Sequence, residues 1–226
     1  MRRAIASLAV LLSACATGAD SAQPQTETPV LELARDPAVT RVAAEMPAGD
    51  YVLDPRHTSV LWRVRHWGLS PYTGRFDTIS GALSFDTANP AQSSVSVRIP
   101  VASVSTGLVN REGERAWDRE IADALGAATH ADITFVSQSV EVTSPTSGRI
   151  HGVLSLNGQS HPATLETVFE GGRLIPTSQR PTVAFSARTI IRRSQWLTGT
   201  HPLHSHASPG DEIEIIINAE FVRRTA

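Results

Sequence analysis

Three histidines, His201, His204 and His206, stand within six residues near the C-terminal end of the chain. Imidazole nitrogens are common ligands of zinc and copper, and a catalytic zinc site uses three protein ligands and keeps a fourth position for water. Pro202 stiffens this loop, and no carboxylate lies inside it. A solvated loop is therefore the first expectation. A metal-binding protein or an enzyme that uses these histidines remains the alternative hypothesis.

Sequence patterns of other catalytic chemistries are missing. The chain has no Gly-x-Ser-x-Gly and no His-Glu-x-x-His sequence, and Gly171-Gly172 is not followed by the Lys-Ser/Thr of a phosphate-binding loop. Acidic and basic side chains share one expected helical segment: Arg111, Glu112, Glu114, Arg115 and Asp118. Solvent-exposed ion pairs between successive helical turns explain these residues. We therefore expect a protein that is not an enzyme and has no cofactor.

Cys15 is the only cysteine and follows a positively charged start and an apolar run, 4–12, that is too short to span a bilayer. The segment resembles a bacterial lipobox, in which the cysteine is alkylated with a lipid and becomes the new N-terminus. An ordinary secretory signal with an incidental cysteine is the alternative. A lone cysteine in an exported protein cannot form an internal disulfide. We expect lipidation of Cys15 and, since Ala16 follows, a periplasmic protein anchored to the outer membrane.

The chain divides into a lipoprotein signal peptide at 1–14, a lipidated tether at 15–48 and one folded domain at 49–226. The tether begins with Ala, Thr, Gln, Pro, Ser and Glu in no regular period, which is typical of a linker. A short helix is expected between Asp36, a good N-cap, and Pro47, with apolar residues on one face: Val39, Val42 and Met46.

The overall charge argues against two classes of partner. The chain has 226 residues, with 20 Lys and Arg residues against 22 Asp and Glu residues, and no basic block. Nucleic acid and anionic lipid surfaces are therefore poor partners. A hydrophobic content of 41% is sufficient for a sizeable core, whereas 5% aromatic residues argues against a stacking platform.

From Tyr51 onward the apolar residues recur with a period of two. Clear segments are 59–66, 74–87 with a break at Gly81, 94–99, a hairpin turning at Asn157-Gly158, and 212–221. One helix is expected at 111–125, where Trp117, Ile121 and Leu125 share a face and Gly126 ends it. The pattern predicts an all-β, single antiparallel domain of about eight strands with one short helix. A closed barrel removes the edge strands and leaves room for one small ligand.

The order of landmarks resembles the YceI-like family over about 49–223. The matching segments are Tyr51-Val52-Leu53-Asp54, His57-Thr58-Ser59-Val60, His66-Trp67-Gly68, Gly74-Arg75-Phe76, Gly81-Ala82-Leu83-Ser84-Phe85, Ile133-Thr134-Phe135, Gly152-Val153-Leu154-Ser155-Leu156-Asn157-Gly158 and Asp211-Glu212-Ile213-Glu214-Ile215. The chain departs from the family pattern at 116–121, 129–131 and 193–197, which are expected to flank the barrel mouth.

The resemblance implies an extended, lipocalin-like barrel that binds or carries a polyisoprenoid lipid, such as an isoprenoid quinone or a polyprenyl phosphate, without catalysis. The implied tail-binding residues are Trp62, Val64, Phe85, Val97, Phe135, Leu154, Phe185 and Ile215. The candidates for the head group are His57, His66, Arg63 and Arg192. Trp117 and Trp196 are expected to close the barrel end. A barrel filled by its own side chains is the structural alternative, and a homodimer is possible.

Overall fold

A computed structural model describes residues 34, 36–204 and 209–225. The expected signal peptide, Cys15 and His206 lie outside these residues. The strands are β1 (Gly49–Leu53), β2 (Ser59–His66), β3 (Ser70–Phe76), β4 (Ser80–Phe85), β5 (Ser94–Pro100), β6 (Val104–Ser105), β7 (Asp132–Ser144), β8 (Ser147–Leu156), β9 (Gln159–Ile175), β10 (Arg180–Arg192) and β11 (Glu212–Arg223). The helix is α1 (Ala116–Ala124), and the short 3-10 turns are η1 (Ala43–Glu45), η2 (Pro90–Gln92), η3 (Val101–Ser103), η4 (Arg193–Gln195) and η5 (Pro202–His204).

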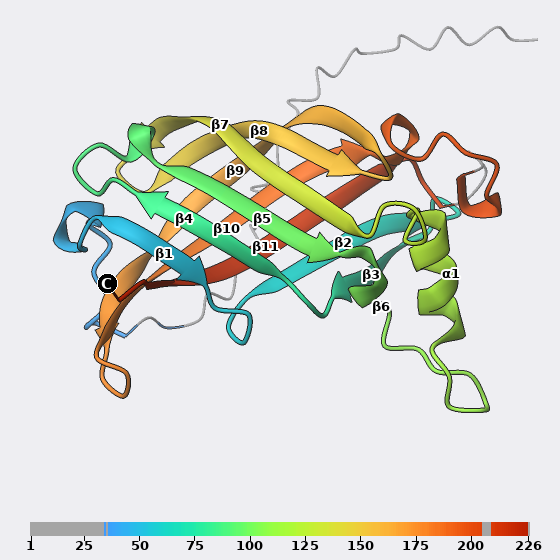
Figure 1. Cartoon of the computed structure of the whole chain (residues 1–226), viewed down its shortest axis with the longest axis horizontal. Coiled ribbons are helices and arrows are strands. Elements are labelled where there is room, and N and C mark those ends of the chain that lie inside the picture. The colour runs from blue at the N-terminus through green and yellow to red at the C-terminus, as the bar shows by residue number, and fades with distance from the viewer. Residues whose placement is uncertain (1–33, 35, 205–208, 226) are drawn as a thin grey trace, which may run out of the picture. The chain divides into compact units, whose positions relative to one another are not determined.

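The strands form a closed antiparallel barrel (Figure 1). The ring runs β1-β4-β5-β7-β8-β9-β10-β11 and closes where β11 pairs with β1, while β2, β3 and β6 continue the sheet from β11. Because β1–β2, β3–β4 and β5–β6 each follow one another along the chain, the barrel consists of eight long strands, three of them bent. Each long strand pairs with its neighbours in sequence, which is an up-and-down barrel. The expected fold class is confirmed.

The bends lie at 54–58, 77–79 and η3, not at Gly81 as the sequence suggested. The backbone N–H of Asp77 donates to the carbonyl of Ser103 at 2.8 Å, so two of the bends are hydrogen-bonded to each other. Gly81 lies inside β4, where a Cβ would come within 2.8 Å of the carbonyl oxygen of Ser96. Glycine at this position therefore permits a close approach between the two strands and does not mark a break in β4.

The prediction of a helix before the barrel is wrong. Only the 3-10 turn η1 forms, because the backbone of Thr40 exchanges two hydrogen bonds with Gly172 on β9 and holds the segment extended. Asp36 pairs with Arg173 at 2.7 Å, and Met46 is buried against the barrel. Residues 36–48, which the sequence assigned to the tether, thus make specific contacts with the barrel.

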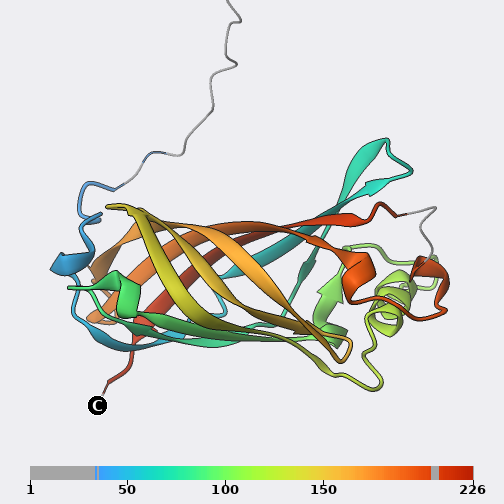
Figure 2. The same ribbon diagram turned by 90° about the horizontal axis from the view of Figure 1, so that it is seen from above.

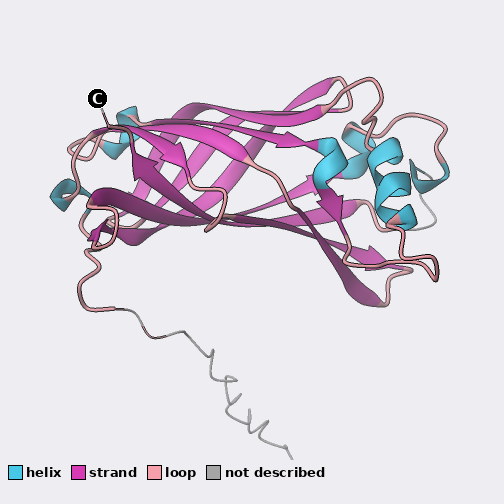
Figure 3. Cartoon of the chain, turned by 60° about the horizontal axis from the view of Figure 1, so that its bottom comes forward, coloured by secondary structure: helices cyan, strands magenta, loops and turns pink. Residues whose placement is uncertain are grey.

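The two ends of the barrel are built differently. One end is filled by aromatic rings, with Phe85, Phe169, Phe185 and Phe221 in contact at centroid distances of 5.4–6.2 Å. At the other end, α1, η4 and η5 lie across the strand ends (Figures 2 and 3). The expected helix 111–125 is confirmed over Ala116–Ala124 only, and Gly126 follows it with a φ of +81°. We call this second end the α1 end.

Candidate functional site

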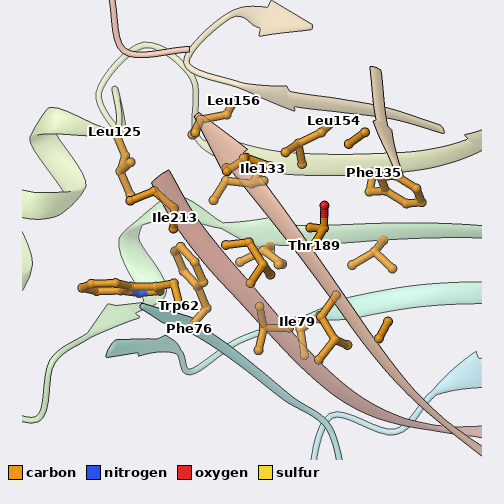
Figure 4. Close-up of a pocket in the computed structure, with 18 of the residues that line it drawn as sticks. Trp62, Phe76, Ile79, Leu125, Ile133, Phe135, Leu154, Leu156, Thr189 and Ile213 are labelled. Carbon is orange, nitrogen blue, oxygen red and sulfur yellow. The ribbon is translucent and has the colours of Figure 1, made fainter. Parts of the chain in front are cut away.

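A cavity of about 670 Å³ occupies the barrel interior. Its walls are the inward faces of the strands, and residues of α1 line one end (Figure 4). Figure 4 labels ten of its lining residues: Trp62, Phe76, Ile79, Leu125, Ile133, Phe135, Leu154, Leu156, Thr189 and Ile213. Nine of these ten side chains are predominantly apolar, so the cavity provides a dry environment for a hydrocarbon.

The polar side chains of the cavity wall are unevenly distributed. Thr167 and Thr189 contribute hydroxyl groups along the barrel, whereas the other polar lining residues come from the α1 end: Trp62, His66, Ser70, Tyr72, Trp117 and Arg193. Toward the aromatic end the wall contains Leu53, Leu83 and Phe221. The cavity therefore has one apolar end and one end that offers hydrogen-bonding groups.

Two of these polar groups have no partner in the described part of the chain. The indole nitrogen of Trp62 and the hydroxyl of Tyr72 are both buried without a hydrogen bond, and their rings lie 5.9 Å apart. The Trp62 ring lies against Gly74, where any Cβ would collide with it. An unpaired buried donor costs about 1–3 kcal/mol. This cost would be recovered if a bound molecule supplied an acceptor.

Arg193 is the residue that the sequence analysis missed. It is 4% exposed and donates to the backbone carbonyls of Leu203, Pro209 and Gly210 at 2.7–2.9 Å. Burial lowers the pKa of its guanidinium. The side chain therefore holds Leu203, Pro209 and Gly210 at the cavity end. The sequence analysis pointed to its neighbour Arg192, which is exposed, although Arg193 shares the inward parity of the β10 residues Thr189 and Ile191.

A second set of hydrogen bonds holds α1 in place. Asp118 is buried and accepts hydrogen bonds from the backbone N–H and hydroxyl of Thr106 and from the Arg115 guanidinium at 2.6–2.8 Å. Arg115 also reaches Asp77 at 3.4 Å. Burial opposes ionisation of Asp118, but the bonds from Thr106 and Arg115 hold its pKa below the usual value. The expectation of a purely solvated ion pair is wrong for Asp118.

The expected tail-binding residues largely face the cavity. Trp62, Val64, Val97, Phe135, Leu154, Phe185 and Ile215 line it, whereas Phe85 is buried in the aromatic end behind the wall. Alternation along each strand explains this agreement, since every second residue points inward. Trp117 also lines the cavity, and Trp196 is buried beside it with its indole N–H donating to the carbonyl of Leu154.

Most of the residues expected to bind the head group lie outside the cavity. His66 lines the cavity, but Arg63 lies between two inward residues and pairs with Glu214 on the outer face at 3.5 Å. Arg192 is exposed. His57 is outside the cavity and pairs with Asp54 at 2.8 Å. Parity along the strands directs Arg63 and Arg192 outward.

The histidine loop makes contacts of its own. His204 Nε2 lies 2.7 Å from the carbonyl of Ala124 at the end of α1, and the backbone N–H of Leu203 donates to His201 Nδ1 at 3.2 Å. These two imidazoles thus join η5 to α1 and shape the loop.

One other group has the composition of a metal site. Among the described residues, the ligand atoms of Asp54, His57 and Glu220 lie within 4.8 Å of one another at the bend between β1 and β2. The hydrogen bond to Asp54 raises the pKa of His57. Partial burial opposes ionisation of Asp54, but the bonds from His57 and the backbone of Arg56 hold its pKa below the usual value. Asp54 therefore serves as the hydrogen-bond acceptor that closes the bend between β1 and β2.

The fold and the cavity together define a lipocalin-like barrel, a class of eight-stranded antiparallel barrels that can hold one small ligand. Within that class the chain belongs to the YceI-like family, since residues 51–221 match the model of the YceI-like domain. A UPF0312 protein of Ectopseudomonas mendocina is 36% identical over 188 residues, covering 81% of this chain and 92% of that protein.

Solved structures with the same fold are also found. Burkholderia cenocepacia BcnA superimposes with a TM-score of 0.64 at 23% identity, covering 74% of this chain and 98% of that one. A polyisoprenoid binding domain from Saccharophagus degradans superimposes with a TM-score of 0.54 at 18% identity, covering 77% of this chain and 98% of that one. At these identities the likeness establishes the fold.

Within the part of the chain that the structure covers, the helices all lack the length and apolar composition needed to cross a bilayer.

Proposed function

We propose that this protein binds a polyisoprenoid lipid, an isoprenoid quinone or a polyprenyl phosphate, in the barrel interior and does not transform it. The apolar cavity of about 670 Å³ carries this proposal. Each buried CH₂ group of a ligand contributes about 0.8 kcal/mol, so a long hydrocarbon needs little else for tight binding. Membership of the YceI-like family and the fold shared with a polyisoprenoid binding domain support the choice of ligand.

The distribution of polar groups orients the ligand. The hydrocarbon tail lies toward Phe185 and Phe221, and the head group lies at the α1 end beside Trp62 and Tyr72. The free indole N–H and the phenol hydroxyl can both donate to a quinone carbonyl or a phosphate oxygen. Arg193 stabilises this end by holding Leu203, Pro209 and Gly210.

Lipid extraction combined with native mass spectrometry tests the ligand. The protein is purified gently from its native membrane, and a discrete added mass that extracts as an isoprenoid is expected. A bare protein mass that stays unchanged after incubation with isoprenoid quinones and polyprenyl phosphates would refute the proposal. Trp62→Phe and Tyr72→Phe should weaken binding of a quinone more than binding of a hydrocarbon that lacks the head group, because each removes one donor.

The cellular location is a second part of the proposal. The lipobox-like segment that ends at Cys15 supports an envelope protein held on the outer membrane by lipid on that residue, with the barrel in the periplasm. Mass spectrometry of the N-terminal peptide should find acyl chains on Cys15. Cys15→Ser should release the chain from the membrane fraction, and retention of this variant would contradict the anchor.

A further inference from the structure

Large apolar side chains are exposed at two loop tips of the α1 end. Trp67 is 63% exposed and Leu69 is 74% exposed in the turn between β2 and β3, and Leu108 and Val109 are 53% and 64% exposed in the segment before α1. These four are close to half of the nine large apolar residues exposed in the described part of the chain. Figure 2 shows the β2–β3 hairpin extending away from the barrel wall at this end. We call these four residues the apolar tips.

The backbone at Trp67 is held in an unfavourable conformation. Its φ is +50°, in the left-handed region, and it is followed by Gly68 at +72°. The N–H of Leu69 donates to the carbonyl of His66, so the chain makes a tight turn in which Asn or Gly is the usual residue at the position of Trp67. A bulky ring in this place costs stability and gains no burial, which indicates a role outside the folded chain.

The apolar tips are continuous with the cavity. His66 and Ser70, which flank the turn of Trp67, both line the cavity wall, and so does Leu108. The tips therefore adjoin the end of the cavity that contains the polar groups. A molecule that enters or leaves at this end passes beside Trp67 and Leu108.

One arginine supports the hairpin tip. The guanidinium of Arg65 donates to the carbonyl of Leu69 at 2.7 Å, and the backbone carbonyl of Arg65 accepts from Gly210 at 2.8 Å. The tip is thus tied to Gly210, whose own carbonyl accepts a hydrogen bond from Arg193. The arrangement places a cation directly behind an exposed indole and leucine, which is the order of groups met at a membrane interface.

We infer that the apolar tips dock on the surface of a lipid bilayer, with Trp67 and Leu69 inserted at the level of the head groups. The inference rests on the proposed function, because a water-insoluble isoprenoid must pass between a bilayer and the cavity without crossing water. The bilayer fits better than a protein partner because the exposed apolar groups lie on two separate loop tips, whereas a stable protein interface requires one contiguous face. The tips bring the cavity end against the membrane that supplies or receives the lipid.

Quenching of tryptophan fluorescence by brominated lipids tests the docking. The full chain carrying Cys15→Ser, so that no lipid on that residue holds it to the membrane, is mixed with phosphatidylethanolamine and phosphatidylglycerol vesicles containing acyl-brominated phosphatidylcholine. Wild-type fluorescence should be quenched, and Trp67→Phe should abolish the part that belongs to this residue. Trp62 and Trp117 line the cavity, so the difference between the two proteins isolates contact by the tip.

Sedimentation with the same vesicles gives a second measurement. The double variant Trp67→Ser/Leu69→Ser should lower the partition coefficient by about tenfold or more. Leu174→Ser is the matched control, since Leu174 is 52% exposed on β9 next to the turn at the opposite end of the barrel. Equal quenching of wild type and Trp67→Phe, or equal partition of the double variant and the Leu174→Ser control, would overturn the docking.

Native mass spectrometry of the same preparations separates this inference from the proposed function. Bound isoprenoid without Trp67-dependent quenching overturns the docking alone. Trp67-dependent quenching without bound isoprenoid overturns the proposed function alone. The side chains of Trp67, Leu69 and Leu174 are exposed, so unchanged melting temperatures will show that these variants remain folded.

Discussion

Replacing a small cavity-lining residue by a large apolar one tests most directly where the ligand lies. Ala187 on β10 lines the cavity and pairs with Ile217 on β11 and Thr167 on β9, which line it too. Ala187→Phe places a phenyl ring between these side chains without adding a polar atom. If the ring displaces about four carbon atoms of the ligand, the loss is about 3 kcal/mol at about 0.8 kcal/mol for each carbon. The dissociation constant should rise about a hundredfold.

The assay is a titration with an isoprenoid that carries a fluorescent head group, repeated with shorter chains. Longer chains should lose more affinity than short ones, because only they reach past the new ring toward Phe185. Ile190→Phe is the matched control, since Ile190 is 65% exposed on the outer face of the same strand. Its affinity should equal that of the wild type.

Two results would refute the reasoning. Unchanged affinity in a folded Ala187→Phe protein would mean that the ligand does not occupy this level of the barrel. A large fall in melting temperature would mean that the space around Ala187 is already filled, because overpacking a dense core costs about 1–3 kcal/mol.

Three further predictions concern the α1 end and the first bend. Arg193→Met should lower the free energy of unfolding by about 3 kcal/mol, because it leaves the half-buried carbonyls of Leu203, Pro209 and Gly210 without the Arg193 donor, and limited proteolysis should then cut beside these residues. Asp118→Asn should cost about 2 kcal/mol near neutral pH; since folding lowers the pKa of Asp118, denaturant titrations should find this difference vanishing as the pH falls through that lowered pKa. His57→Gln should destabilise the protein most between about pH 3.8 and 6.5, the usual pKa values of Asp54 and His57. Folding raises the pKa of His57, so its contribution is complete below 6.5 and is lost as the pH rises through the raised value, whereas the contribution of Asp54 is lost as the pH falls through its lowered value. A difference that persisted unchanged at alkaline pH would contradict the ion-pair explanation.

Strand periodicity was sufficient to predict most of the barrel wall. In β11, Ile213, Ile215 and Ile217 line the cavity as the alternation indicated. Inward and outward positions within a strand follow from local geometry alone, and this local rule needs no knowledge of the neighbouring strands.

Features that depend on contacts between distant segments were not predictable in the same way. The break assigned to Gly81 is in fact a close approach to Ser96, a residue on the paired strand. Arg193 continues the inward alternation of Thr189 and Ile191, but the carbonyls that give it its role lie ten or more residues further along the chain. The helix predicted from the cap at Asp36 does not form. Backbone pairing with β9 competes with it, and a short isolated helix has little stability of its own.

The presence of a cavity is a property of register, and this is why alternation alone could not distinguish a binding barrel from a filled one. Alternation records which residues are apolar, whereas free space depends on which small residues meet across the strands. Here Ala187 pairs with Thr167, and Gly152 pairs with Ala163 and leaves room for the Phe135 ring to lie against its backbone, so small side chains and this one ring adjoin along the middle of the barrel. At the aromatic end the register instead brings phenylalanine rings together, and they fill the interior. A one-residue shift of β9 against its neighbours would separate the small residues and close the space, so the pairing of the strands, together with the composition of their inner faces, makes this barrel hollow.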